Sequence, residues 1–312
     1  MLGRCRGRTS PGLAPLSDAK NASRLDGIRI GILHHSGSKL VRQGYLIDSM
    51  ADLWKGRGAE VVDIVGTDTP VPVDLLLLHV DLSVVPEAYR RFAQNHSRVI
   101  NLSAVDIRKR NYLKDLVGVD DESSGPVIVK SNLNHGGLPE RLLGPRPSGA
   151  ARLVAGIRRG LRRRLGLVNE IRFKIDYEIL PDRGSVPARR FSDGSVVQRF
   201  RPERRDGDFV LREYYFFGDV EVLSMEIGSD PILTTGRQVD YRVASPPPEV
   251  RAVRDRLNLD RGKIDFSCPE REVVVYDANK CVGTRADPGE PVRKIAADLS
   301  MGIDAWVHCD AS

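Results

Sequence analysis

Near the end of the chain, two pairs of polar residues each have a two-residue spacing, and together they contain two carboxylates, one amide and one lysine. Asp265 follows Lys263 in Lys-Ile-Asp-Phe, and Asn279 follows Asp277 in Asp-Ala-Asn. Side chains two positions apart on a strand share a face, so these residues would place three oxygen donors and one cation together. Such oxygens suit Mg²⁺, which prefers a few carboxylates plus a substrate phosphate. A solvated hairpin face with Asp and Asn at the strand end explains the same residues equally well.

Two short segments must carry these side chains. The stretches 263–266 and 272–279 are rich in β-branched and aromatic residues, and Cys-Pro-Glu-Arg lies between them at 268–271. Proline and charged residues between two such runs are typical of a tight reversal. We therefore predict a β-hairpin.

A second candidate group follows a strand predicted at 126–130. That strand ends on Lys130 and continues into Ser-Asn-Leu-Asn-His-Gly-Gly, which ends at Gly137. A lysine at a strand end can bind nucleotide phosphates while the amides of a glycine-containing loop bind the remaining oxygens. An ordinary strand end and turn is the alternative.

The N-terminal part predicts a small α/β domain over residues 27–103. Apolar strands expected at 28–33, 60–65, 74–79 and 99–102 alternate with helices at 44–57 and 86–95, which is typical of a parallel sheet covered on both faces. His34 and His35 open the loop after the first strand. With no Cys, Asp or third His nearby in the sequence, a polar loop or a substrate contact is favoured over a metal.

The remainder, 104–312, has an α+β pattern. We expect helices at 104–117, 150–167, 249–257 and 291–299, and strands at 175–180, 195–200, 209–217 and 220–227. The helix at 150–167 carries Arg158, Arg159, Arg162, Arg163 and Arg164 around its circumference, which favours a solvated face over a nucleic-acid stripe.

Composition limits the partners and the compartment. The chain has 312 residues, 41% hydrophobic, and a net charge of +6, which favours anionic partners. It has no apolar run long enough to span a bilayer. Its four cysteines lack metal-ligand spacing, so a reducing cytoplasm is expected. Residues 1–26 predict a disordered leader.

Taken in order along the chain, the candidate residues resemble the ATP-grasp superfamily, which includes D-alanine ligases and glutathione synthetases. The resemblance covers roughly 100–285, and the α/β unit before it matches the preceding domain usual there. It implies two α+β subdomains, at about 104–200 and 201–312, with ATP between them. The residues that carry the resemblance are Lys130, Asn134, Gly136, Gly137, Gln198, Arg199, Phe200, Glu203, Arg212, Lys263, Asp265, Asp277 and Asn279.

The resemblance implies a role for each of these positions. Lys130 and the loop with Asn134, Gly136 and Gly137 would contact phosphates, with Lys109 or Arg110 as a second upstream cation. The segment Gln198, Arg199 and Phe200 would form the adenine hinge, where Gln stands in place of the more usual Glu, and Glu203 would bind the ribose. Asp265, Asp277 and Asn279 would bind magnesium, while Arg212 and Lys263 would face the transferred phosphoryl group. Lys280 to Gly283 replaces the usual Pro-Gly turn.

The implied activity is an ATP- and Mg²⁺-dependent ligase, with Mn²⁺ as an alternative metal. A carboxylate would be activated as an acylphosphate for attack by an amine, on small-molecule or peptide substrates. A kinase that stops at phosphoryl transfer is the alternative, and a basic nucleic-acid-binding protein is the outsider. No membrane or nucleic-acid partner is expected, and a homodimer is left open. Residues 138–190 would form a lid or, equally well, a permanently packed segment.

Overall fold

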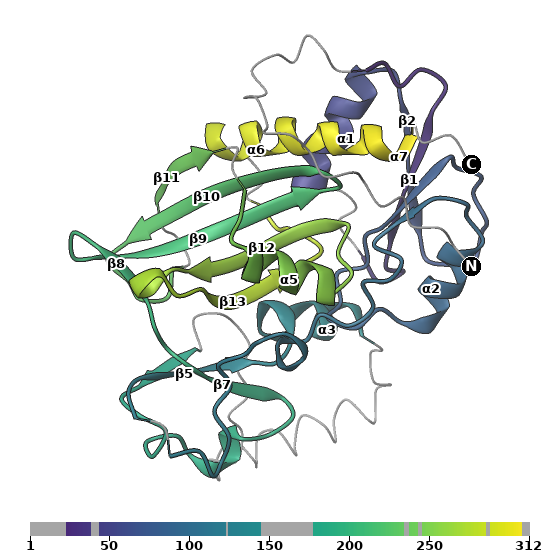
Figure 1. Ribbon diagram of the computed structural model, residues 1–312. Helices are drawn as coiled ribbons and strands as arrows, with labels where there is room; N and C mark the ends of the chain where they lie inside the picture. Colours follow the sequence, from purple (N-terminus) through teal and green to yellow (C-terminus); the bar gives the residue numbers. More distant parts are fainter. Residues whose placement is uncertain are drawn as a thin grey trace.

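The computed structural model describes residues 23–38, 44–122, 124–144, 177–233, 237–242, 245–284 and 288–307. It contains one parallel sheet and two antiparallel sheets (Figure 1). Within these ranges, no helix combines the length and the apolar character that crossing a membrane requires.

The first unit is built on a parallel sheet in the order β2-β1-β3-β4. Its elements are β1 (Arg29–His34), α1 (Leu46–Gly56), β2 (Glu60–Val65), β3 (Leu75–Leu78), α2 (Glu87–Gln94) and β4 (Val99–Ile100). The central strands β1 and β3 are almost wholly buried because helices and later segments cover both faces. The alternation of strands and helices in the sequence therefore predicted this unit correctly.

The second unit is a three-stranded antiparallel sheet in the order β6-β5-β7. Its elements and those around it are η2 (Lys109–Asn111), β5 (Val127–Ser131), η3 (Asn134–Gly137), α3 (Leu138–Leu143), β6 (Glu178–Leu180), η5 (Ala188–Arg190) and β7 (Ser195–Arg199), where η denotes a 3-10 helix.

The third unit is a six-stranded antiparallel sheet in the order β11-β10-β9-β12-β13, with β8 also paired to β9. Its elements are β8 (Glu203–Arg205), β9 (Asp208–Phe217), β10 (Val220–Gly228), β11 (Arg237–Arg242), α5 (Pro248–Arg256), β12 (Arg261–Ser267), η6 (Pro269–Arg271), β13 (Val274–Asn279), α6 (Glu290–Ser300), η7 (Met301–Ile303) and α7 (Asp304–Val307). The predicted hairpin is confirmed as β12, η6 and β13.

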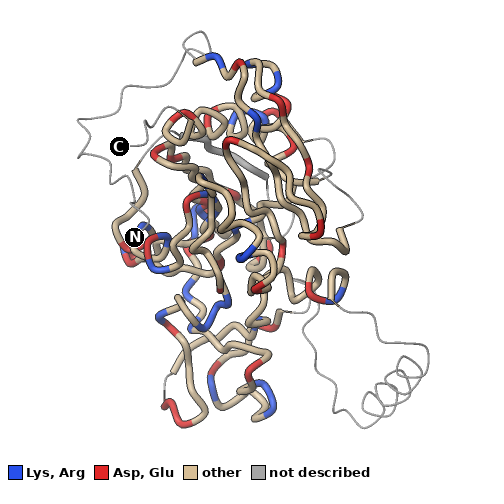
Figure 2. The backbone as a smooth tube through the Cα atoms, turned by 90° about the vertical axis from the view of Figure 1, so that its right-hand side faces the viewer, with Lys and Arg blue, Asp and Glu red and all other residues tan. Residues whose placement is uncertain are grey.

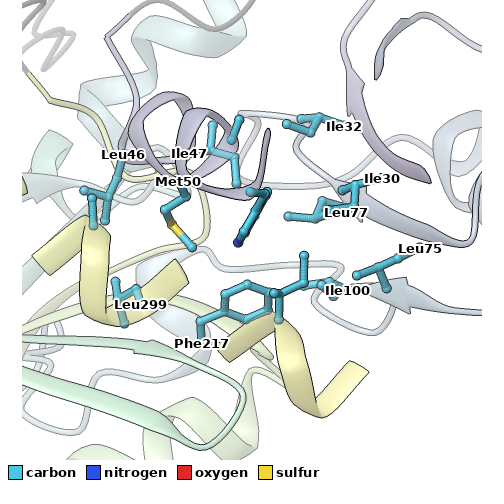
Figure 3. Packing of buried hydrophobic residues seen from close by; sticks show 14 of the residues in the cluster. Ile30, Ile32, Leu46, Ile47, Met50, Leu75, Leu77, Ile100, Phe217 and Leu299 are labelled. Atoms are coloured by element: carbon cyan, nitrogen blue, oxygen red, sulfur yellow. The ribbon is translucent and has the colours of Figure 1, made fainter. Parts of the chain in front are cut away.

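The largest buried cluster joins the first unit to the end of the chain. Met50 of α1 lies in the same cluster as Phe217 of β9 and Leu299 of α6 (Figure 3). The indole N–H of Trp54, also on α1, donates to the Ser300 carbonyl oxygen at 2.9 Å. Apolar burial of this kind contributes about 25 cal/mol per Å². The parallel sheet is therefore held against the six-stranded sheet by a continuous core.

The opposite face of the six-stranded sheet has its own core. Tyr214 and Phe216 of β9 pack there with Ile264 and Phe266 of β12 and with Val250 of α5. Neighbouring residues of β9 therefore belong to two different cores, as the alternation of side chains along a strand requires.

The prediction of a helix at 104–117 is wrong. The structure has only the short η2 turn there, and the segment is otherwise held by bonds to distant backbone. The Val105 carbonyl oxygen accepts from the Val85 N–H, and the Ile107 N–H donates to the Ser83 carbonyl oxygen. The Asp106 carboxylate also accepts from the Arg108 N–H at 3.0 Å, a local bond that competes with helix formation.

Four other expectations fall wholly or partly outside the described residues. These are most of the leader at 1–26, the helix at 150–167, much of the lid segment at 138–190 and the first two residues of the strand at 175–180.

Candidate functional site

The β12–β13 hairpin aligns the predicted oxygen donors by cross-strand pairing. Asp265 lies directly opposite Asp277, and Lys263 lies opposite Asn279. On the other side of β12, Asp265 pairs with Glu213 of β9. Directly opposite residues share a sheet face, so these side chains form one charged row, which we call the carboxylate row. It comprises Glu213, Lys263, Asp265, Asp277 and Asn279.

Lysines compensate the buried acids of the carboxylate row. Lys263 Nζ lies 2.6 Å from Glu213 Oε1 and 2.9 Å from Asp265 Oδ1. Burial opposes the charge on Lys263, yet the attraction of Asp265 and Glu213 raises its pKa well above the ordinary value. Lys109 Nζ, with 1% of its side chain exposed, lies 2.9 Å from Asp277 Oδ1. Each of these carboxylates therefore has a cation within contact distance.

Lys130 links the three-stranded sheet to the hairpin. Its Nζ donates to Gln198 Oε1 at 2.6 Å and to the Tyr276 carbonyl oxygen at 2.9 Å. Gln198 in turn donates to the Val275 carbonyl oxygen at 2.8 Å. These bonds hold the predicted phosphate lysine beside β13, at Tyr276, the residue that precedes Asp277 in the sequence.

The Gln198 side-chain oxygen and the backbone N–H groups of Arg199 and Phe200, in the predicted adenine hinge, form hydrogen bonds within the protein. Gln198 is fully buried, and its oxygen accepts from Lys130. The Arg199 N–H donates to the Asp115 carbonyl oxygen, the Phe200 N–H donates to the Pro126 carbonyl oxygen, and the Arg199 side chain is exposed. Of these three residues, Phe200 is the one that lines the pocket described next.

A pocket of about 640 Å³, partly open to solvent, lies between the two antiparallel sheets. Lys109, Lys130, Phe200, Asp265 and Asp277 are on its wall, so the fold brings these five predicted residues together. The rest of the lining is mainly apolar and aromatic: Ile128, Tyr177, Pro202, Phe209, Val210, Leu211, Pro231, Ile232, Leu233 and Tyr276. An apolar wall with a few charged groups suits a nucleotide base joined to phosphates.

The predicted glycine loop forms the 3-10 turn η3. His135, Gly136 and Gly137 all have positive φ, at 45°, 65° and 71°. The left-handed backbone at Gly137 favours glycine, and a Cβ there would lie 3.0 Å from Leu133 Cδ1, which would have to shift. Successive left-handed residues can form an anion-binding concavity. Asn134, at the start of the turn, donates its backbone N–H to Ser83 Oγ at 2.8 Å.

Glu203 and Arg212 bind each other. Two bonds of 2.8 and 2.7 Å join the guanidinium to the carboxylate, and the Cys268 N–H donates to Glu203 at 2.9 Å. Burial raises the pKa of Glu203, but the hydrogen bonds from Arg212 and Cys268 and the nearby arginine charges together outweigh it, so the pKa lies below the ordinary value. Arg212 pairs with Phe266, whereas Lys263 and Asp265 pair with Tyr215 and Glu213. The register therefore directs Arg212 and Lys263 to opposite faces of the sheet, contrary to their expected shared role.

The carboxylate row fits a magnesium ion. Asn279 Oδ1 is buried and, among the described residues, accepts no hydrogen bond. It shares a face with two buried carboxylates, and two carboxylates with an amide leave positions for water and phosphate oxygens. No group of three His, Cys, Asp or Glu side chains in the described part could hold a metal, so this set would need the phosphate to complete it.

Sequence reasoning missed two groups. Glu213, which pairs with Lys263, gave no signal because it lies within an aromatic strand. His34 is buried, and its Nε2 lies 3.0 Å from Asp63 Oδ1, while His79 packs edge-to-face against it at 5.4 Å between ring centroids. An Asp and a third His thus lie close to His34 in space, although they are distant in the sequence.

Solved structures of ATP-grasp proteins match the chain over most of its length. A RimK-domain ATP-grasp protein from Sphaerobacter thermophilus is 14% identical with a TM-score of 0.44, covering 89% of this chain and 99% of that one. D-Alanine–D-alanine ligase from Bacillus anthracis complexed with ATP is 11% identical with a TM-score of 0.39, covering 90% and 96%. Macrocyclase MdnC bound with precursor peptide MdnA from Microcystis aeruginosa is 9% identical with a TM-score of 0.46, covering 87% and 99%.

At these identities and TM-scores the similarity carries no assignment of function. No protein-family profile and no curated protein sequence matches the chain.

Proposed function

We propose that this protein is an ATP- and Mg²⁺-dependent ligase that joins a carboxylate to an amine. The observation that carries the proposal is the wall of the pocket, where Asp265 and Asp277 lie with Lys109 and Lys130 beside an apolar cavity. Buried acids next to buried lysines at the mouth of an apolar pocket suit a metal-bound polyphosphate attached to a purine.

Each group has a proposed task. Asp265, Asp277 and Asn279 would hold Mg²⁺, or Mn²⁺ in its place, and the bound metal would neutralise charge on the phosphate oxygens. Lys109, Lys130 and Lys263 would bind phosphate oxygens as point charges. Phe200 and the apolar wall would bind the base. Arg212, tied to Glu203, would set the position of that carboxylate for the ribose.

The proposed reaction has two steps. A substrate carboxylate oxygen attacks the γ-phosphorus of ATP, the bond to the bridging oxygen breaks, and ADP leaves. The amine nitrogen then bonds to the acyl carbon, inorganic phosphate departs, and the amine loses a proton. Positioning and positive charge are the main requirements for the first step.

Other parts of the proposal concern organisation. We propose domain limits of 27–103 and 104–312, a division of the latter near residue 200 and a cytoplasmic location. Basic and acidic residues are interspersed along the described chain (Figure 2), which suits small-molecule or peptide substrates better than a nucleic-acid backbone. A homodimer is compatible with the proposal.

The test is ADP release from Mg²⁺-ATP with a panel of carboxylic acids and amines, followed by hydroxylamine trapping. A hydroxamate indicates an acylphosphate, and Lys130→Met should lower ADP release at least about 100-fold by removing a charge at the phosphates. The exposed Lys294→Met is the matched control. A stable phosphorylated product without hydroxamate would indicate a kinase, and no ATP binding by calorimetry would refute the proposal.

A further inference from the structure

Where the parallel sheet meets the hairpin, three neighbouring buried residues each have one unsatisfied hydrogen-bond donor. These donors are His79 Nε2, Arg261 Nε and Lys280 Nζ, and among the described residues none of these atoms has a hydrogen-bond partner. The three side chains belong to residues that are at most 3% exposed. A buried polar atom without a partner costs free energy, so three in one place require an explanation.

Contacts join the three residues into one network. Arg261 Nη2 lies 3.1 Å from His79 Nδ1 and donates to the Lys280 carbonyl oxygen at 3.3 Å. The His79 ring is also held edge-to-face by Tyr45, with 4.9 Å between centroids. The ring therefore has a defined orientation.

The network determines which nitrogen of His79 carries the proton. A guanidinium only donates, so His79 Nδ1 must accept from Arg261, and the neutral ring then has its proton on Nε2. Burial and the charges of Arg261, His34 and Lys280 all lower the pKa of His79 well below its ordinary value, which agrees with a neutral ring. Each of the three atoms is thus a donor that lacks an acceptor.

The neighbouring acids do not satisfy these donors. The Asp81 carboxylate accepts from the Tyr45 hydroxyl at 2.9 Å, and Glu140 Oε1 accepts from the Ser83 N–H at 2.8 Å. Both acids attract Lys280, but neither is within hydrogen-bond distance of its Nζ. A single water molecule has two acceptor positions, whereas a carboxylate offers about four.

The position of the network is that of a ligand site. His79 follows β3 directly, and His34 ends the neighbouring strand β1, so both lie at the carboxyl end of a parallel sheet, where such sheets bind ligands. Arg261 precedes Lys263 by two residues on β12 and so continues the face of the carboxylate row. Lys280 follows Asn279 in the chain.

We propose that His79, Arg261 and Lys280 form a binding site for a substrate carboxylate, next to the proposed metal ligands. The assignment rests on the proposed function only in calling the bound anion a substrate. Lys280 is a specificity-determining residue whose positive charge attracts the carboxylate. His79 donates one directional hydrogen bond to it, and Arg261 fixes the orientation of the His79 ring.

Thermal unfolding tests the site without ATP. The probes are sodium acetate, succinate and glutamate, each compared with sodium chloride at equal ionic strength. At least one should raise the wild-type Tm by about 2 °C, the shift expected near ten times the Kd for a chain of this length. Lys280→Met should abolish this response. In chloride alone it should raise the Tm, because it removes a buried charge whose ammonium group donates no hydrogen bond to the described residues.

Two further variants test the role of His79 and control for the loss of a surface lysine. His79→Asn preserves an acceptor for Arg261 but removes the Nε2 proton, and should weaken the response. Lys294→Met, on the exposed face of α6, should respond like wild type. The proposal is overturned if no carboxylate stabilises the wild type, if Lys280→Met keeps the response, or if Lys280→Met lowers the Tm in chloride.

A Mg²⁺-ATP titration of the same proteins separates the two proposals. ATP binding with no carboxylate response would refute the carboxylate site alone. A carboxylate response without ATP binding would refute the ligase proposal and leave the carboxylate site in place.

Discussion

The carboxylate row and the carboxylate site adjoin at strand β12 but differ in how their buried charges are compensated. In the row, Asp265 and Asp277 each have a lysine nitrogen at 2.9 Å. In the site, Lys280 Nζ and His79 Nε2 have no hydrogen-bond partner among the described residues. The attraction between paired charges offsets part of the free energy lost when they leave water. Donors without an acceptor lower the stability of the fold until a ligand binds to them. The difference indicates which region is complete in the folded chain and which requires a substrate.

The largest expected effect comes from breaking a pair in the carboxylate row. Lys109→Met leaves the Asp277 carboxylate, 5% exposed, without its lysine. We expect the free energy of unfolding to fall by about 3 to 5 kcal/mol, measured by urea denaturation.

Two variants control this result. Lys109→Met with Asp277→Asn should lose less than Lys109→Met alone, since no unpaired charge remains. Lys55→Met, whose partner Asp52 is exposed, should cost under about 0.5 kcal/mol. A loss no larger than that of Lys55→Met would show that the row is not a compensated pair.

A smaller effect is expected from Asn279, the member of the row whose amide oxygen has no bond. Asn279→Leu replaces a proposed metal ligand with an apolar side chain of the same branched shape. The change breaks no internal hydrogen bond at the amide oxygen among the described residues. The Mg²⁺ dependence of ATP binding should weaken at least about tenfold in calorimetry, while the urea midpoint should change little. The exposed Gln94→Leu is the control. Unchanged Mg²⁺ dependence would remove Asn279 from the metal site.

The smallest effect concerns the half-buried pair of Glu203 and Arg212, which lies on the other sheet face. Arg212→Leu should cost about 0.5 to 1 kcal/mol at pH 7, since the pair is partly screened by solvent. Although burial alone would raise it, Arg212 lowers the folded pKa of Glu203. The contribution is therefore present above the unfolded value of about 4.3 and is lost as pH falls through the lowered folded value.

Urea midpoints at pH 7 and pH 3 check this sign. The difference between wild type and Arg212→Leu should shrink at pH 3, whereas the exposed Arg256→Leu should differ from wild type equally at both. A difference that grows on acidification would contradict the pairing.

The sequence determined those features that depend on neighbours along the chain. Runs of β-branched and aromatic residues on either side of a proline-containing turn predicted β12 and β13, and the two-residue spacing of Asp277 and Asn279 placed them on one face, because strand geometry requires it. Apolar runs separated by helices predicted the parallel sheet for the same local reason.

Only the tertiary structure decided which distant groups meet. Residues 104–117 have the composition of a basic helix, yet bonds to Ser83, Val85 and Asn132 keep the segment out of an α-helix and bring Lys109 to Asp277. Arg212 and Lys263 are separated by strand register, which spacing along one strand cannot reveal. His79, Arg261 and Lys280 come from three separate segments, and their unsatisfied donors exist only because burial of the assembled fold removes water from them.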